Sequence, residues 1–189
     1  GGAGAGGPGG VAGGAGRRRG ANTEKESAKG GRAVDVPGAA GWRHGAFLNM
    51  GGERRGKSLG NVHTRRAGLA QQDSMQGGEA TRFFLLRGHY RSEINFSWEA
   101  LADAGNTLRG FYTALREAPP LDAPIDWSNS YAARWRDAMN DDFDTPVAFA
   151  ALHELRGEVN RTKSRSLAGL LKALGGTIGL LQADPETFL

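Results

Sequence analysis

The regular spacing of apolar residues after residue 97 is the feature that most restricts how this chain can fold. In the first such segment they lie three or four positions apart, which is the repeat of one face of an α-helix. These positions are Leu101, Ala104, Leu108, Phe111, Tyr112 and Leu115. Ser97 is a suitable N-cap, and Pro119-Pro120 ends the pattern because proline cannot continue a helix. The sequence therefore predicts a helix of about five turns between them.

Three later segments show the same repeat. Tyr131, Trp135 and Met139 are four residues apart and predict a second helix. We expect a third helix with Thr145 as N-cap and Pro146 at its first position, and a fourth from near Ser166 to Gly175-Gly176. Their inner faces would be Ala148, Leu152, Leu155 and Val159, and Leu167, Leu170, Leu171 and Leu174. Four amphipathic helices with short connections predict a mainly α fold, an antiparallel bundle over residues 97–183.

Residues 1–40 have a different composition. Eleven of the 31 glycines lie in residues 1–20, where Val11 is the only larger apolar side chain. Such a segment cannot offset the entropy of ordering itself, so we expect a disordered Gly/Ala/Arg-rich arm. Residues 1–70 carry 12 basic and 4 acidic residues, whereas residues 71–189 carry 12 and 16. The basic character therefore belongs to the N-terminal third, and Arg17-Arg18-Arg19 either attracts phosphates or is a solvated charged tail.

A glycine-bounded loop, Gly51 to Asn61, carries the most suggestive polar residues. Lys57 and Ser58 offer a cation, a hydroxyl and free backbone N–H groups, which together suit a polyphosphate. A solvated turn is the other interpretation, because the same letters occur by chance in many basic loops. Farther along, residues 81–87 form an apolar cluster that predicts a buried helix segment, and Gly88 breaks it before His89-Tyr90-Arg91.

Composition excludes several kinds of site. The chain has no cysteine, which rules out disulfides, thiolate zinc sites and cysteine nucleophiles within these 189 residues. No apolar run approaches the roughly 20 residues of a membrane span. Asp141, Asp142 and Asp144 could suggest a metal site, but we favour helix N-terminal capping, and no metal site is predicted. His44 and His63 have no partner at ligand spacing, and His153 lies within a predicted helix, so we expect none of the three to be catalytic.

The order of the sequence blocks resembles one family. Trp42 begins WRHGAFLNMGGE, KSLGN follows at Lys57, RFFLLRGHYRS at Arg82, INFS at Ile94 and DDFDTP at Asp141. In content and spacing these blocks resemble the C-terminal part of cysteinyl-tRNA synthetase, from about Trp42 to Leu189. The resemblance implies the end of a class I Rossmann-type catalytic domain over residues 41–96, followed by a tRNA-contacting bundle over residues 97–189. It also implies that the chain is a fragment.

The resemblance implies an ATP-dependent ligase that attaches cysteine to its tRNA through cysteinyl-adenylate. ATP with magnesium, cysteine and the tRNA would be its ligands. Lys57 would be catalytic, neutralising charge on the ATP phosphates, and Arg54, Lys57 and Ser58 would bind ATP. Where the family has Lys-Met-Ser, this chain has Arg54-Arg55-Gly56. The family's zinc site and its His-Ile-Gly-His signature are missing, so we expect this chain to be inactive alone.

Several residues keep two interpretations. Arg156, Arg161, Lys163 and Arg165 form either a face for tRNA phosphates or a solvated helix end. His89-Tyr90-Arg91 either approaches adenosine or tRNA or forms a structural turn. Trp98, Trp127 and Trp135 favour packing over stacking on nucleic acid. The alternatives to a ligase are a non-catalytic tRNA- or RNA-binding helical module and a plain helical interaction domain. We expect a cytoplasmic monomer with no membrane partner.

Overall fold

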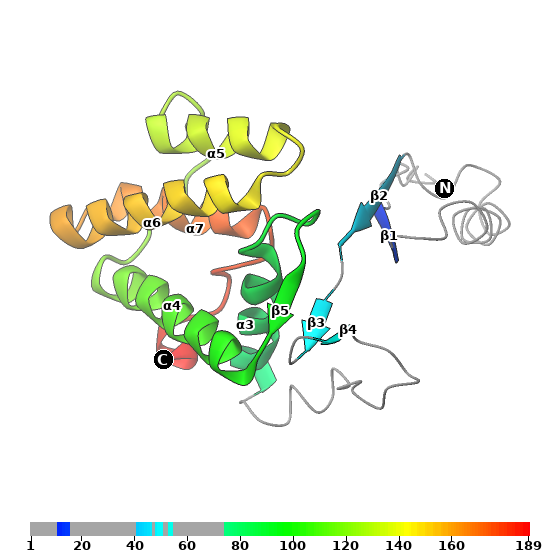
Figure 1. The fold of residues 1–189 in the computed structure, drawn as a ribbon. Helices are drawn as coiled ribbons and strands as arrows, with labels where there is room; N and C mark the ends of the chain where they lie inside the picture. Colours follow the sequence, from blue (N-terminus) through cyan, green and yellow to red (C-terminus); the bar gives the residue numbers. More distant parts are fainter. Residues whose placement is uncertain (1–10, 16–40, 47, 51–52, 55–73) are drawn as a thin grey trace, which may run out of the picture.

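A computed structural model describes residues 11–15, 41–46, 48–50, 53–54 and 74–189. Four short strands come first along the described chain, and a fifth lies between the first two of the helices that follow (Figure 1). The predicted mainly α fold is confirmed over the described residues. None of the helices in these ranges is long and apolar enough to cross a membrane.

Two small sheets precede or border the helices. Strand β1 (Val11–Ala15) pairs in parallel with β2 (Gly41–Gly45). In the other sheet, β3 (Leu48–Met50) lies between β4 (Glu53–Arg54), which is antiparallel to it, and β5 (Ile94–Phe96), which is parallel. The five described residues of the arm expected to be disordered therefore form a strand. For the rest of residues 1–40, which lie outside the described ranges, disorder stays a prediction.

Helix α3 (Ser74–Leu86) lies on the chain between β4 and β5 and packs along α4 (Trp98–Glu117). Helix α4 is the predicted first helix of the bundle. Ser97 is its N-cap, accepting a hydrogen bond from the Ala100 N–H at 3.1 Å. All six predicted inner positions of α4 are buried, which confirms both the helix and its face.

Helices α5 (Ser130–Asn140) and α6 (Thr145–Thr162) lie side by side (Figure 1). Trp135 is buried at the centre of the predicted face of α5, with Tyr131 and Met139 partly buried beside it. The predicted cap of α6 was wrong by one residue. Asp144 is the N-cap and accepts from the Val147 N–H, because its carboxylate reaches the first-turn amides, while Thr145 is already helical and buried.

Helix α7 (Arg165–Gly176) is the predicted fourth helix and is capped by Ser164. The short helix α8 (Pro185–Phe188) follows it and packs on α4, with the rings of Phe188 and Tyr112 stacked 3.8 Å apart. Between α4 and α5, the linker lies directly against α7: the Leu121 N–H donates to the Arg165 carbonyl at 3.0 Å. A Cβ at Gly169 would lie 2.1 Å from the Leu121 carbonyl oxygen, so this contact requires glycine.

One apolar core joins the helices, and α3 shares it. Phe83 and Phe84 of α3 are buried, and the Phe83 ring packs edge-on against Phe149 of α6 at 4.8 Å and Phe111 of α4 at 6.4 Å. The predicted bundle began at residue 97. Packing therefore adds α3, a helix that precedes β5 in the chain, to the same core.

Candidate functional site: the supports of the Lys57 segment

The predicted ATP-binding residues divide between described and undescribed positions. Arg54 is the last residue of β4, while Lys57 and Ser58 lie outside the described residues, within 55–73. The roles of all three residues stay predictions. What the structure shows is the pair of elements at the two ends of this segment, β4 before it and α3 after it.

The strand before the segment is held through the three-stranded sheet. Strand β4 pairs with β3, and β3 pairs with β5 so that Leu48 lies opposite Ile94. The Asn49 side chain donates to Glu93 Oε2 at 3.0 Å and to Asn95 Oδ1 at 3.2 Å. These contacts are polar and exposed, so water competes with them.

The helix after the segment is held by a partly buried carboxylate. Glu79 of α3 accepts a hydrogen bond from the Tyr112 hydroxyl at 2.8 Å and another from the Leu181 N–H at 2.6 Å. The Tyr112 oxygen in turn accepts from the Ala183 N–H at 3.2 Å. Burial, followed by the Glu79 carboxylate, raises the pKa of Tyr112 far above its ordinary value, so this hydroxyl remains a donor. Glu79 thus fastens α3 to α4 and to the C-terminal segment.

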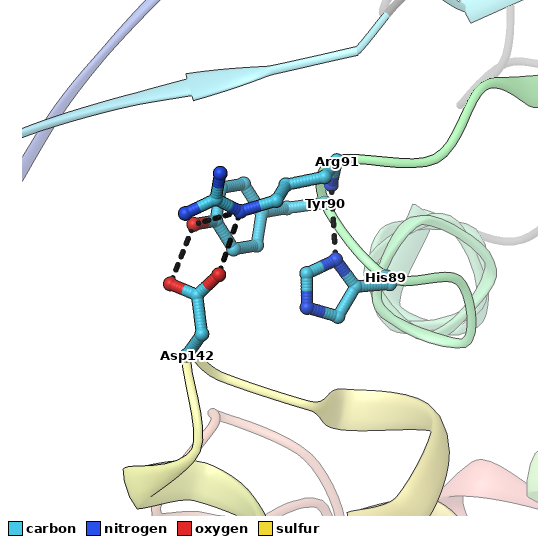
Figure 2. A network of polar contacts seen from close by, with 4 residues as sticks. All are labelled: His89, Tyr90, Arg91 and Asp142. Carbon is cyan, nitrogen blue, oxygen red and sulfur yellow. Dashed lines mark hydrogen bonds and ion pairs between the residues drawn. The ribbon is translucent and has the colours of Figure 1, made fainter.

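A second polar cluster joins the turn after α3 to the turn before α6 (Figure 2). Asp142 accepts from the Tyr90 hydroxyl at 2.7 Å through Oδ1 and from Arg91 Nε at 2.6 Å through Oδ2. Arg91 Nε also lies 3.0 Å from the Tyr90 oxygen, and its guanidinium packs over the Tyr90 ring at 5.3 Å. The hydrogen bond to Asp142, then that to Tyr90, raises the pKa of Arg91 above its ordinary value.

The backbone of this turn is also held. The Ala46 N–H donates to the Tyr90 carbonyl at 2.8 Å, and the Ser92 N–H donates to the His89 carbonyl at 2.8 Å. His89 Nδ1 accepts from the Arg91 N–H at 3.2 Å, and its ring stacks on Tyr90 (Figure 2). Of the two interpretations of His89-Tyr90-Arg91, the structure thus supports a structural turn.

The predicted tRNA-binding residues lie along α6 and at its junction with α7. Arg156 is half-buried, with its guanidinium over the Phe111 ring at 4.9 Å. Next to it, His153 also contacts Phe111, at 5.0 Å between ring centroids. Burial, and secondarily the Arg156 charge, lowers the pKa of His153. Arg156 therefore contributes to packing whatever else it contacts.

The other three cations are exposed and have partners within the chain. Arg161 pairs with Glu158 of its own helix, and Lys163 pairs with Glu117 at the end of α4. Each contact lowers the pKa of the carboxylate that accepts it. Arg165 Nε donates to the Pro119 carbonyl at 3.0 Å. Exposed pairs of this kind break easily in favour of a phosphate, so the tRNA role stays a prediction.

The three tryptophans and the three aspartates singled out in the sequence lie in different environments. Trp135 is buried, Trp98 is partly buried with its ring 5.2 Å from Phe96, and Trp127 is 42% exposed. The three aspartates have different structural roles: Asp144 caps α6, Asp141 is the C-cap residue of α5, and Asp142 binds Tyr90 and Arg91. Within the part of the chain that the structure describes, no group of three or more histidine, cysteine or acidic residues could hold a metal ion.

Sequence reasoning missed two hydrogen bonds that join distant parts of the fold. Glu79 is 102 residues from Leu181, and Tyr90 is 52 residues from Asp142. No local pattern marks such pairs. One signal for Asp142 was available in the sequence. Three aspartates precede α6, and a helix N-terminus needs only one of them as N-cap, so the others are available for other contacts.

Comparison with known families matches most of the chain in two parts. Residues 20–106 match the family of tRNA synthetases class I (C) catalytic domain, and residues 134–182 match the DALR domain. The first match begins at residue 20, ahead of Trp42, where the resemblance was expected to begin. It therefore reaches into the segment expected to be disordered.

Individual proteins are similar to this chain over most of its length. The cysteine–tRNA ligase of Acidovorax sp. (strain JS42) is 49% identical over 166 residues, which is 88% of this chain and 35% of that protein. The enzyme of the same name from Polaromonas sp. (strain JS666 / ATCC BAA-500) is 48% identical over the same shares. That from Dechloromonas aromatica (strain RCB) is 49% identical over 148 residues, or 78% of this chain and 32% of the relative. The chain thus spans about a third of the length of the relatives it matches.

Proposed function

We propose that this chain, which belongs to the cysteinyl-tRNA synthetase family, serves the ATP-dependent attachment of cysteine to its tRNA through cysteinyl-adenylate. The observation that carries the proposal is the continuity of the match. An alignment to a cysteine–tRNA ligase extends over 166 residues, or 88% of this chain, so it must overlap both the catalytic domain match and the DALR match.

Within this function the chain would supply the ATP loop. Lys57 is the residue whose long, cationic side chain would neutralise the charge that develops on the ATP phosphates as the adenylate forms. Ser58 and Arg54 would add a hydroxyl and a second cation, and magnesium would accompany ATP. The supports on both sides of the segment favour this role, because a phosphate-binding loop must begin and end at defined points of the fold.

The zinc site implied by the family does not fit this sequence. Cysteine thiolates would hold the zinc that binds the substrate thiol in that site, and these 189 residues contain no cysteine. We therefore propose that selection of cysteine depends on residues other than those of this chain. Since tRNA charging accompanies translation, we expect a cytoplasmic location.

Cysteine-dependent exchange of pyrophosphate into ATP tests whether selection of cysteine depends on residues other than those of this chain. We expect no exchange with this chain alone, because the cysteine site is missing. Exchange above the background of a Lys57→Ala variant would contradict the proposal that cysteine selection lies elsewhere.

The bundle would contact the tRNA through Arg161, Lys163 and Arg165 at the α6–α7 junction. Phosphate contacts release counterions, so affinity for tRNA should fall steeply between low and moderate salt. Salt-dependent tRNA binding without any ATP binding would instead favour the non-catalytic RNA-binding module. Absence of tRNA binding at low salt would contradict both.

A further inference from the structure

The turn between α5 and α6 and the first residue of α6 hold the segment after α3 at two separate points. Asp142 binds the Tyr90 hydroxyl and Arg91 Nε, one carboxylate oxygen to each (Figure 2). Three residues later, the Thr145 hydroxyl donates to the Gly88 carbonyl at 3.3 Å. The bundle thus contacts both the start of this turn and its centre.

The same turn is bonded on its other side to the strands. The Tyr90 carbonyl accepts the Ala46 N–H at 2.8 Å, in the connection between β2 and β3. A Cβ at Gly45 would lie 3.5 Å from the same oxygen, so the two backbones are in close contact. Hydrogen bonds therefore run from Asp142 through Tyr90 to Ala46, which lies two residues before β3, and β3 pairs with β4.

The backbone at Asp142 is held in an unusual conformation. Asp142 has φ 51° and Phe143 has φ 56°, both in the left-handed region that side chains other than glycine rarely adopt. Two consecutive residues of this kind persist only where surrounding contacts fix them, and such strain collects at functional positions. Here the strained turn aims a carboxylate at Arg91.

We propose that Asp142 is a positioning residue that fixes strands β3 and β4 against the helical bundle and so sets where the segment carrying Lys57 begins. The effect of Asp142 on ATP binding rests on the proposed function. Its role in holding the strands against the bundle does not. Both hydrogen bonds involve a charged group, which makes them stronger than neutral ones. The contact nevertheless lies near the surface, with the Asp142 side chain 33% exposed and that of Arg91 64% exposed, so it can open without unfolding the core.

Amide hydrogen exchange in the full chain tests the mechanical part. Asp142→Asn removes the charge and Asp142→Gly removes both acceptors, and each residue type tolerates positive φ. The matched control is Asp103→Asn, which breaks the exposed 2.9 Å ion pair with Arg87 elsewhere in the fold. We expect exchange at the Ala46 amide to accelerate about tenfold in Asp142→Gly and less in Asp142→Asn, with amides of α6 and α7 unchanged.

Three results would overturn the inference. Exchange at Ala46 could remain as in the unsubstituted chain. It could accelerate together with α6 and α7, which would indicate general destabilisation. It could also accelerate to the same degree in Asp103→Asn, which would remove any special role for Asp142.

Titration with ATP and magnesium adds a readout that a merely structural contact would not change. We expect Asp142→Gly to weaken ATP binding several-fold at an unchanged unfolding temperature. Equal affinity in the two proteins would overturn the positioning role. If the unsubstituted chain itself bound no ATP, the proposed function would fail, and exchange at Ala46 would still decide the mechanical claim.

Discussion

The two supports of the Lys57 segment differ in kind. On the sheet side, short strands are held by exposed polar contacts such as that of Asn49 with Glu93, and by the carboxylate of Asp142. On the helix side, α3 buries Phe83 and Phe84 in the common core and fastens Glu79 to Tyr112. Burial of apolar surface provides most of the stabilisation of α3, whereas directed hydrogen bonds hold the strands in place. The difference indicates that α3 is fixed more firmly than strands β3 and β4.

The largest expected effect is on the helix side. Phe83→Ala leaves a cavity between Phe111 and Phe149, and should lower the free energy of unfolding by about 3–5 kcal/mol. Leu85→Ala on the same helix is the matched control, since Leu85 is 41% exposed and should cost much less. Urea denaturation followed by circular dichroism measures both. Equal costs would break the comparison, because α3 would then not depend on the core.

A smaller loss is expected at the buried polar contact. Tyr112→Phe removes the hydroxyl that donates to Glu79 and accepts from Ala183, leaving partly buried groups unsatisfied at a cost of about 1–3 kcal/mol. The ring packing on Phe188 is retained. Thermal unfolding measures the loss. No change in the unfolding temperature would indicate that α3 is held by apolar contacts alone.

The contact between α6 and the turn after α3 should contribute less. Thr145→Val keeps the shape of a buried side chain but removes the hydrogen bond to the Gly88 carbonyl, at an expected cost of about 0.5–1.5 kcal/mol. Chemical denaturation gives the value, with Thr113→Val as a control for a partly exposed helical threonine. A cost as large as that of Phe83→Ala would show that the sheet side is as firmly held as the helix side.

The smallest effect concerns pH. Burial lowers the pKa of His153 below its unfolded value, so the folded chain binds fewer protons than the unfolded chain. His153 therefore costs no stability above about pH 6.5, and stability is lost as pH falls from there through the folded-state pKa. His153→Gln should reduce the difference in urea midpoint between pH 7.5 and pH 5.5. These values lie about one pH unit above and below the ordinary histidine pKa. An unchanged difference would exclude His153 as the cause.

Local patterns predicted the helices because each inner face depends only on residues three or four positions apart. Leu152 and Leu155 of α6, for example, are buried as their spacing indicated. The cap of α6 was misplaced because Asp144 and Thr145 are both good capping residues and adjacent. Spacing along the chain cannot choose between them.

Contacts between distant residues were beyond sequence reasoning. The pairing of Tyr90 with Asp142 depends on how α5 and α6 turn back toward the sheet, and that of Glu79 with Leu181 on the return of the C-terminal segment. Both follow from packing of the whole bundle. The roles of Lys57 and Ser58 came from a family resemblance and stay predictions.

Binding of ATP with magnesium to this chain and to its Lys57→Ala variant tests the central claim most directly. The account predicts that the unsubstituted chain binds ATP and that the variant binds at least about tenfold more weakly, while the affinity for tRNA at low salt is unchanged, since Lys57 acts on the ATP phosphates alone. Equal affinity of the two proteins for ATP would contradict the account.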